Sequence, residues 1–292
     1  MTSFDPAQLS PVKVQAILQT AVAPRPIAFA STISADGTPN LSPFSFFNVF
    51  SSNPPILVFS PARRVRDNTT KHTLQNVHAT REVVINVVDF PIVQQASLSS
   101  TEYPDGVNEF VKSGLTMLKS EKVAPFRVAE SPVQFECKVN DIIPLGENGG
   151  AGNLVICEVV MIHVANSALD ENGNMDQRRI DLVSRLGQNW YSRANAGLFE
   201  VPKPLTTLGI GVDAIPERIR NSKVFDGNDL GMLGNVEALP ADEEIDTFVK
   251  ENFGVKAVLS ASDVTLTHQK AKEYLVAGDA LSAWKILLAK QQ

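Results

Sequence analysis

Residues that bind metals or act as nucleophiles are scarce in this sequence. Of its 292 residues, four are histidine and two are cysteine. They are His72, His78, His163, His268, Cys137 and Cys157. None of their spacings matches a zinc-binding motif, and two cysteines cannot build a disulfide-rich scaffold. The sequence therefore predicts no metal site and no disulfide framework.

Three glycine-containing fingerprints are also absent. The chain has no GxGxxG, no GxxxxGK[ST] and no GxSxG, and LGIGVD at residues 208–213 does not replace the first of them. These motifs bind dinucleotides in Rossmann folds, bind phosphates in P-loop proteins and hold the serine nucleophile of α/β-hydrolases. A Rossmann site, a P-loop and a nucleophilic triad are all unsupported.

Long apolar runs and excess positive charge are missing as well. The net charge is −6 and the pI is near 5.3, which argues against a nucleic-acid partner. No apolar run approaches the roughly 18–20 residues that span a bilayer. The N-terminus lacks the basic start and apolar core of a signal peptide. We expect a globular cytoplasmic protein without a membrane partner.

Residues 25–60 have the pattern of three strands. We expect the strands at residues 27–34, 40–47 and 56–60. Ala35-Asp36-Gly37 predicts a turn after the first strand, because Asp tolerates and Gly readily adopts left-handed geometry. Asn53-Pro54-Pro55 stops the chain before the third strand.

The following residues add more strands and a few helices. We expect helices at residues 11–20, 68–81, 92–99 and 106–112, a strand at 82–88, and a hairpin of residues 133–139 and 154–163. Strands joined with little helix between them favour an antiparallel barrel or sandwich. Counting outward from the hairpin loop places Cys137 near Cys157 on one inward face. A disulfide is geometrically possible there, but the pattern favours a pair of reduced thiols packed in the core.

The composition changes after Pro202-Lys203-Pro204. Residues 205–240 are rich in Gly, Asn and Leu with weak periodicity, and helical patterns follow at 241–252, 267–276 and 280–290. We therefore predict a domain at residues 1–204 and a C-terminal extension at 205–292, which is loop-rich and then helical over about 241–290.

Polar residues interrupt the Phe-rich strand ends. Ser31, Thr32, Ser45, Asn48, Ser51 and Ser52 lie among phenylalanines, which suits either a pocket for a flat heteroaromatic ligand or strand-end caps in a core. Lys71 and Thr73 open the helix expected at 68–81, where free amides and the helix dipole favour a phosphate. The alternative is a solvated helix start beside Arg63, Arg64 and Arg66. One flat ligand that carries a phosphate accounts for both features.

These motifs support a family resemblance. RPIAFASTISADGTPNLSPFSFFNVFSSNPPILVFS, then KHTLQN and EVVINVV, resembles the flavin reductase-like family of FMN-binding split barrels, which includes flavoredoxin and nitrilotriacetate monooxygenase reductase components. The resemblance covers roughly residues 15–204. It implies a mainly β fold, a Greek-key split β-barrel with peripheral helices, here followed by the α-helical extension. It also implies a homodimer with FMN near the subunit interface.

The resemblance also assigns residues to the cofactor. It places these at the FMN site: Ser31, Thr32, Asn40, Ser45, Phe46, Phe47, Asn48, Ser51, Ser52, Lys71, Thr73 and His163. Lys71 and Thr73 match the family's K-x-T and are expected at the phosphate or ribityl chain. His72 is not transferred, because relatives often have Asp there. His163 either lies near the flavin or is a half-buried strand histidine bonded to a backbone carbonyl.

Residues 184–191, SRLGQNWY, resemble the family's R-L/Y-G-G-x-x-Y. The match implies that Arg185, Trp190 and Tyr191 lie on the nicotinamide or substrate side, where they would bind a phosphate or carboxylate and stack on a ring. The alternative is a cluster of Arg and aromatic residues at the dimer seam. Gln188 stands where a second Gly is common, so the family motif does not fix the backbone conformation at this point.

The resulting expectation is an NAD(P)H-dependent FMN reductase that transfers hydride from the nicotinamide to flavin N5. No side chain is assigned as a catalytic acid. Two alternatives remain: a flavoprotein with tightly held FMN that reduces another small molecule, and a non-catalytic flavin-binding protein that docks a monooxygenase. The sequence does not choose between NADH and NADPH, since it shows no recognisable reader of the ribose 2′ position.

Overall fold

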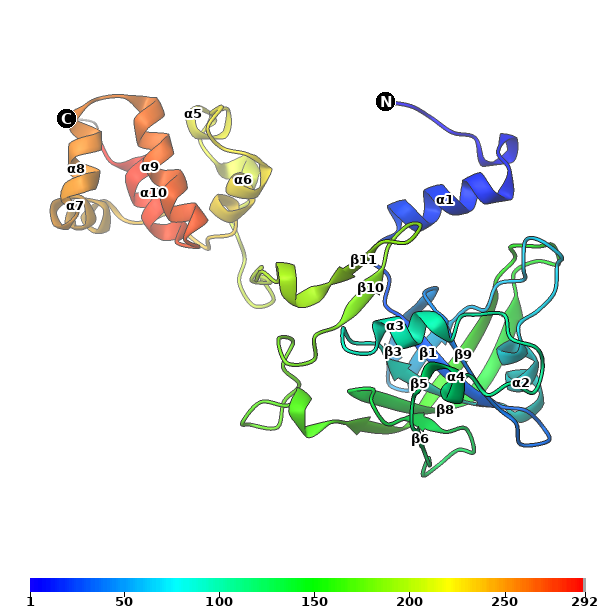
Figure 1. Cartoon of the computed structure of the whole chain (residues 1–292). Coiled ribbons are helices and arrows are strands. Elements are labelled where there is room, and N and C mark those ends of the chain that lie inside the picture. Colours follow the sequence, from blue (N-terminus) through cyan, green and yellow to red (C-terminus); the bar gives the residue numbers. More distant parts are fainter. Residues whose placement is uncertain (291–292) are drawn as a thin grey trace. The chain divides into compact units, whose positions relative to one another are not determined.

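The computed structural model describes residues 1–290 of the chain. The chain forms two compact units, Met1–Phe199 and Glu200–Gln292, and each is described here by itself. The first unit contains the sheet and its surrounding helices, and the second is helical (Figure 1).

One antiparallel sheet of seven strands dominates the first unit. Its strands are β1 (Ala28–Ile33), β2 (Pro39–Phe44), β3 (Phe47–Ser52), β4 (Pro55–Phe59), β5 (Glu82–Val87), β8 (Val133–Pro144) and β9 (Asn153–Val164). They lie in the order β2-β1-β5-β8-β9-β4-β3. Two short ladders accompany the sheet: β6 (Met117–Leu118) with β7 (Arg127–Val128), and β10 (Val183–Arg185) with β11 (Tyr191–Arg193). The predicted antiparallel β architecture is confirmed.

The sheet must curl because β2 and β3 follow each other in the chain yet lie at its opposite edges. Only Ser45 and Phe46 separate the two strands, and three Cα–Cα steps of about 3.8 Å span no more than roughly 11 Å. The rings of Phe44 on β2 and Phe59 on β4 lie 5.4 Å apart, which brings the two edges together. The single strand expected at residues 40–47 is therefore wrong: the chain bends at Ser45 and Phe46 and starts a new strand on the far edge.

Alternate residues of the strands form an apolar cluster. It contains Ala28, Ala30, Phe44, Leu57, Phe59, Leu74, Val77, Val83, Ile85, Cys137, Val139, Val155 and Cys157. Both cysteines are free thiols with no exposed surface, on the face that the hairpin pattern predicted. Burial raises the pKa of both thiols, so they remain neutral. On the opposite face, Phe29 and Leu41 pack against Ile92, Ala96 and Phe110.

Helices surround the sheet as predicted, with one corrected start. The helices are α1 (Pro11–Ala21), α2 (His72–Thr80), α3 (Val93–Leu98) and α4 (Glu109–Ser113), with 3-10 turns η1 (Pro6–Gln8), η2 (Asn166–Ala168) and η3 (Ala194–Gly197). The helix expected from residue 68 begins at His72. Asn68 has a left-handed φ of 57°, and the Thr69 hydroxyl bonds Asp67 Oδ1 at 2.6 Å. These residues form a turn, and Lys71 takes the N-cap position.

The second unit contains more helix than the sequence indicated. Its elements are η4 (Val212–Ala214), α5 (Glu217–Arg220), α6 (Gly227–Gly234), α7 (Asp242–Glu251), α8 (Phe253–Ser260), α9 (Val264–Val276) and α10 (Ala280–Leu288). Residues 205–240 were expected to be loops, but Asp226 and Asp229 form a capping box that starts α6. Trp284 is fully buried and its indole N–H donates to the Leu233 carbonyl at 2.9 Å. Within the described residues, no helix is long and apolar enough to cross a membrane.

Candidate functional site

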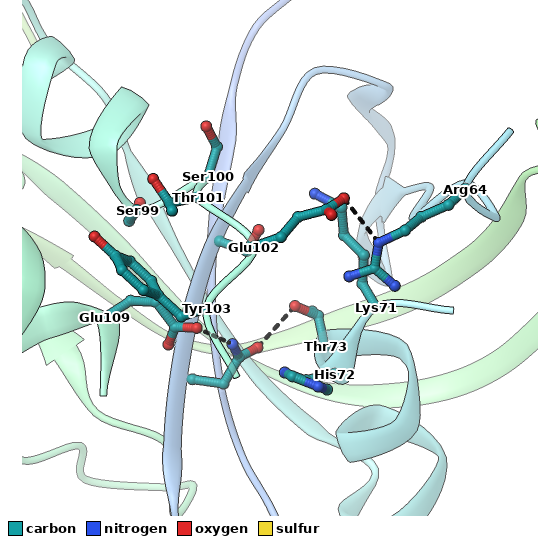
Figure 2. Close-up of a pocket in the computed structure, with 12 residues that line it drawn as sticks. Arg64, Lys71, His72, Thr73, Ser99, Ser100, Thr101, Glu102, Tyr103 and Glu109 are labelled. Atoms are coloured by element: carbon teal, nitrogen blue, oxygen red, sulfur yellow. Dashed lines mark hydrogen bonds and ion pairs between the residues drawn. The ribbon is translucent and has the colours of Figure 1, made fainter. Parts of the chain in front are cut away.

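A small cavity lies at the free edge of β2, where the loop between α3 and α4 faces the start of α2 (Figure 2). Its volume is about 30 Å³. It is lined by Asn40, Ser42, Arg64, Lys71, His72, Thr73, Ser99, Ser100, Thr101, Glu102, Tyr103 and Glu109. These segments are far apart in the sequence and meet at this edge because the sheet has no further strand beside β2.

Asn40 is the centre of a buried hydrogen-bond network beside the cavity. Its Oδ1 accepts from the hydroxyls of Thr73 at 2.8 Å and Thr32 at 3.2 Å. Its Nδ2 donates to Glu109 Oε1 at 3.1 Å. The Asn76 amide in turn donates to the Thr32 hydroxyl at 3.0 Å. The hydroxyl protons of both threonines are therefore used inside the protein, where the network fixes α2 and α4 against β1 and β2.

Glu109 protects the edge of β2. Its Oε2 accepts the backbone N–H of Leu41 at 3.0 Å, which an edge strand would otherwise leave unpaired. Burial raises the pKa of the Glu109 carboxyl, and the hydrogen bonds from Leu41 and Asn40 oppose this shift.

Cationic groups converge on the other side of the cavity. Arg64 Nε lies 2.9 Å and Arg66 Nη2 lies 3.0 Å from the two carboxylate oxygens of Glu102. The Lys71 ammonium lies 5.1 Å from the centre of the Phe44 ring. Burial lowers the pKa of Lys71, the nearby Arg64 lowers it further, and Glu102 acts in the opposite direction. Arg64 and Lys71 both line the cavity, and this positive charge favours a bound anion.

A second, larger cavity of about 170 Å³ shares Asn40 and His72 with the first. Its other lining residues are Ser34, Asp36, Thr38, Pro39, Gln75, Asn76, Asp105, Gly106 and Val107. The His72 ring lies beside a carboxylate, with Nε2 4.0 Å from Asp105 Oδ1. Both cavities are lined by two acids, but only the first is also lined by an arginine and a lysine, Arg64 and Lys71, so the cationic cavity is the better place for a phosphate.

Residues 21–183, more than half of the chain, match the model of the flavin reductase-like domain. The chain belongs to the flavin reductase-like family. An uncharacterized protein of Aquifex aeolicus is 40% identical over 173 residues, which cover 59% of this chain and 86% of that protein.

Two solved structures of the flavin reductase-like family share the architecture. Nitrilotriacetate monooxygenase component B from Bacillus cereus is 28% identical with a TM-score of 0.65, and the match covers 69% of this chain and 98% of that one. A Shewanella frigidimarina protein, assigned as a flavin reductase with a split barrel domain, is 25% identical with a TM-score of 0.58, over 70% and 100% of the two chains. The split-barrel fold predicted from the sequence is confirmed.

In this flavin reductase-like chain, the predicted site residues divide into several groups. Asn40, Lys71 and Thr73 line the cationic cavity, and Thr32 donates a hydrogen bond to Asn40 without lining the cavity itself. Ser31 is fully buried and follows Phe29 by two residues, so it faces away from α2; among the described residues its hydroxyl has no hydrogen-bond partner.

The residues from Ser45 to Ser52 occupy the bend and the edge strand β3. Phe46, Val49 and Phe50 are exposed at 39%, 63% and 69%. The Ser45 hydroxyl accepts from Arg25 Nε at 3.4 Å. Phe47 is partly buried against the apolar cluster, and the remaining polar members Asn48, Ser51 and Ser52 lie along β3, which pairs on one side only.

Arg25 is a buried residue that the sequence patterns did not single out. Its guanidinium donates to the carbonyls of Val22 at 2.7 Å, Leu186 at 2.8 Å and Gln19. Together with its contact to Ser45, these bonds join the end of α1, the bend between β2 and β3, and the β10–β11 hairpin. The signal that could have revealed it is an Arg at the start of an otherwise apolar strand.

His163 is part of a different buried cluster. Its Nε2 lies 2.7 Å from Glu136 Oε1, and it lines neither of the two cavities. Glu136 is fully buried and also accepts the backbone N–H groups of Glu121 at 2.9 Å and Lys122 at 2.6 Å. The histidine therefore bonds a carboxylate, whereas the structural alternative drawn from the sequence gave it a backbone carbonyl.

Arg185 and Tyr191 form a packed pair. The Arg185 guanidinium lies 4.6 Å from the centre of the Tyr191 ring, while Trp190 is 71% exposed. Gln188, in the turn between β10 and β11, has a φ of 52°. This left-handed geometry costs a non-glycine residue roughly 1–2 kcal/mol, which explains why glycine is common there. Gly187 is required by close packing, because an added Cβ would lie 2.4 Å from Thr20 Oγ1.

Replacing Glu136 with glutamine tests the structural role of the His163 cluster. Burial acts to raise the pKa of Glu136, but the amides of Glu121 and Lys122 and the His163 ring hold it below its ordinary value. The ionised carboxylate thus stabilises the fold above pH about 4.3, and this contribution is lost as the pH falls through the lowered pKa. We expect Glu136→Gln to lower the free energy of unfolding by about 2 kcal/mol near neutral pH.

The loss should shrink in acid, where the wild-type carboxyl is protonated. Urea denaturation followed by circular dichroism near neutral and acid pH measures both values. Glu158→Gln, on the partner strand β9, removes a carboxylate that accepts one bond from Asn140 and should change stability by less than about 0.5 kcal/mol. Equal losses for Glu136→Gln at both pH values would contradict this assignment.

Proposed function

We propose that this protein is an NAD(P)H-dependent flavin reductase that binds FMN at the edge of β2. The observation that carries the proposal is the cationic cavity formed by Arg64 and Lys71 beside the bend at Ser45 and Phe46, in a chain of the flavin reductase-like family. A phosphate needs the cations, and a flat ring needs the phenylalanines and free backbone groups that lie next to them.

The residues present fit such a ligand. Lys71 and Arg64 would bind the phosphate, with Ser42 and the lone pairs of Thr73 within the same cavity. Bound FMN would supply N5 as the acceptor of a hydride from the nicotinamide. The protein contributes position and electrostatics: the Asn40 network holds the walls of the cavity, and Arg25 holds the bend.

Reduced flavin would then serve a separate monooxygenase. The similarity to component B of nitrilotriacetate monooxygenase, at 28% identity, supports this partner class. We place the docking surface for such a partner on the second unit, which has its own core around Trp284.

We further propose a homodimer that covers β3. This edge strand exposes Val49 and Phe50, and α1 exposes Val12 and Leu18 at 62% and 54%. An unpaired edge with large apolar side chains is costly in a monomer. A second copy seated on it would also lie next to Ser45 and Phe46, and the flavin ring would then be bound near the interface.

The first experiment is a turnover assay with the purified protein. With FMN added, we expect steady oxidation of NADH or NADPH, measured as loss of the absorbance of the reduced nicotinamide, and little oxidation without flavin. Stoichiometric flavin with no oxidation of either nicotinamide would contradict the reductase and favour a non-catalytic flavin-binding protein.

Replacing Lys71 with alanine tests the position of the phosphate. We expect FMN to bind about tenfold more weakly, because a charge-assisted contact is lost, while riboflavin, which has no phosphate, changes little. Dissociation constants come from quenching of flavin fluorescence. Lys138→Ala is a matched control, since this ammonium pairs with Glu82 and lines neither cavity. An equal loss for both flavins would place the phosphate elsewhere.

Replacing Phe50 with aspartate tests the dimer. We expect light scattering to show a mass of two chains for the wild type and of one chain, 31.7 kDa, for the variant, because a charge on β3 would be buried at the interface. Phe253→Asp changes an 84% exposed phenylalanine of the second unit and should leave the mass unchanged. A wild-type monomer that binds FMN tightly would refute an interface site.

A further inference from the structure

Glu102 occupies Arg64, one of the two cations that the proposed function assigns to the flavin phosphate, and also contacts Arg66. Its two carboxylate oxygens each contact a different guanidinium, Arg64 at 2.9 Å and Arg66 at 3.0 Å. Figure 2 shows the side chain extending from the loop between α3 and α4 toward Arg64 and Lys71. A carboxylate that bridges two guanidinium groups uses the same donors that a phosphate would use.

Glu102 offsets the positive charge of Arg64 and Lys71 around the cavity. Arg64 and Lys71 repel each other, which contributes to the lowered pKa of Lys71, and Glu102 is the anion that offsets this effect. Nearby, Asp67 forms an ion pair with Arg66 at 3.0 Å and accepts a hydrogen bond from the Thr69 hydroxyl. A phosphate dianion that enters the cavity must therefore displace Glu102 or share its donors, while an uncharged flavin can leave the ion pairs intact.

The Glu102 carboxylate can dissociate from Arg64 without unfolding its surroundings. Its side chain is 48% exposed, whereas that of Arg64 is only 20% exposed, so the carboxylate can return to water at little cost while the guanidinium stays in place. Tyr103, the next residue, is in contact with Lys112 on α4 rather than with the cations. The loop can thus release Glu102 without losing its own attachment.

We propose that Glu102 is a specificity-determining residue that competes with the flavin phosphate for Arg64. This inference rests on the proposed function. The competition weakens FMN binding without affecting riboflavin binding. Glu102 therefore reduces the difference in affinity between FMN and riboflavin. It also makes FMN an exchangeable substrate, because the carboxylate re-forms its ion pairs as the phosphate leaves.

The test compares Glu102→Gln with the wild type in flavin titrations. We expect FMN to bind about tenfold more tightly to the variant, mainly through slower dissociation in stopped-flow fluorescence. Riboflavin affinity should change less than about twofold, and added salt should reduce the FMN difference. Inorganic phosphate should displace FMN from the variant at a lower concentration than chloride does at the same ionic strength.

Asp105→Asn is the matched control for net charge. It removes a carboxylate from the same loop that contacts neither guanidinium, and its side chain is 96% exposed. FMN binding should change less than twofold in this variant, and thermal melts should show both variants folded, since exposed ion pairs contribute little stability.

The outcomes separate the two proposals. The competition is overturned if the wild type binds FMN but Glu102→Gln does not bind it more tightly. It is also overturned if both variants bind FMN equally tightly. Either result leaves the reductase proposal standing. Failure of the wild type and both folded variants to bind FMN or riboflavin overturns the reductase proposal and this inference with it.

Discussion

The two-residue connection between β2 and β3 is the constraint on which the rest of the first unit depends. Because Ser45 and Phe46 must join opposite edges of a seven-stranded sheet, the sheet has to curl until those edges meet. The curl creates an apolar interior, and it leaves β2 and β3 as unpaired edges beside each other. Glu109 protects one edge, Arg25 fixes the bend, and the cationic cavity opens beside them.

Polar residues near the edge of β2 have two roles. Thr32, Asn40 and Thr73 were assigned to the flavin by resemblance, and they do lie together, but their protons are committed to one another and to Glu109. Such a network positions the backbone on which Lys71 stands. The polar residues are thus divided between those that hold the cavity walls and a smaller set, the cations, that line the cavity and that we propose as the phosphate ligands.

Local patterns made much of the fold predictable. Alternating apolar residues located β5 and the β8–β9 hairpin, and with them the buried thiols Cys137 and Cys157. The bend at Ser45 carried no glycine or proline, so a continuous strand was the natural reading. Contacts such as Glu109 with Leu41 join residues far apart in the sequence and depend on the closed sheet, which no local pattern encodes. Family resemblance suggested the ligand, and only the three-dimensional arrangement revealed that Glu102 pairs with Arg64 and Arg66 beside the cavity.

The two buried thiols provide a native probe for opening of the barrel. Cys137 and Cys157 come from neighbouring strands in the middle of the sheet, with no exposed surface and with pKa values raised by burial. Since the thiolate is the reactive form, the native protein protects them from alkylating reagents both sterically and chemically. Their rate of alkylation therefore measures how often the barrel opens, and the measurement needs no engineered label.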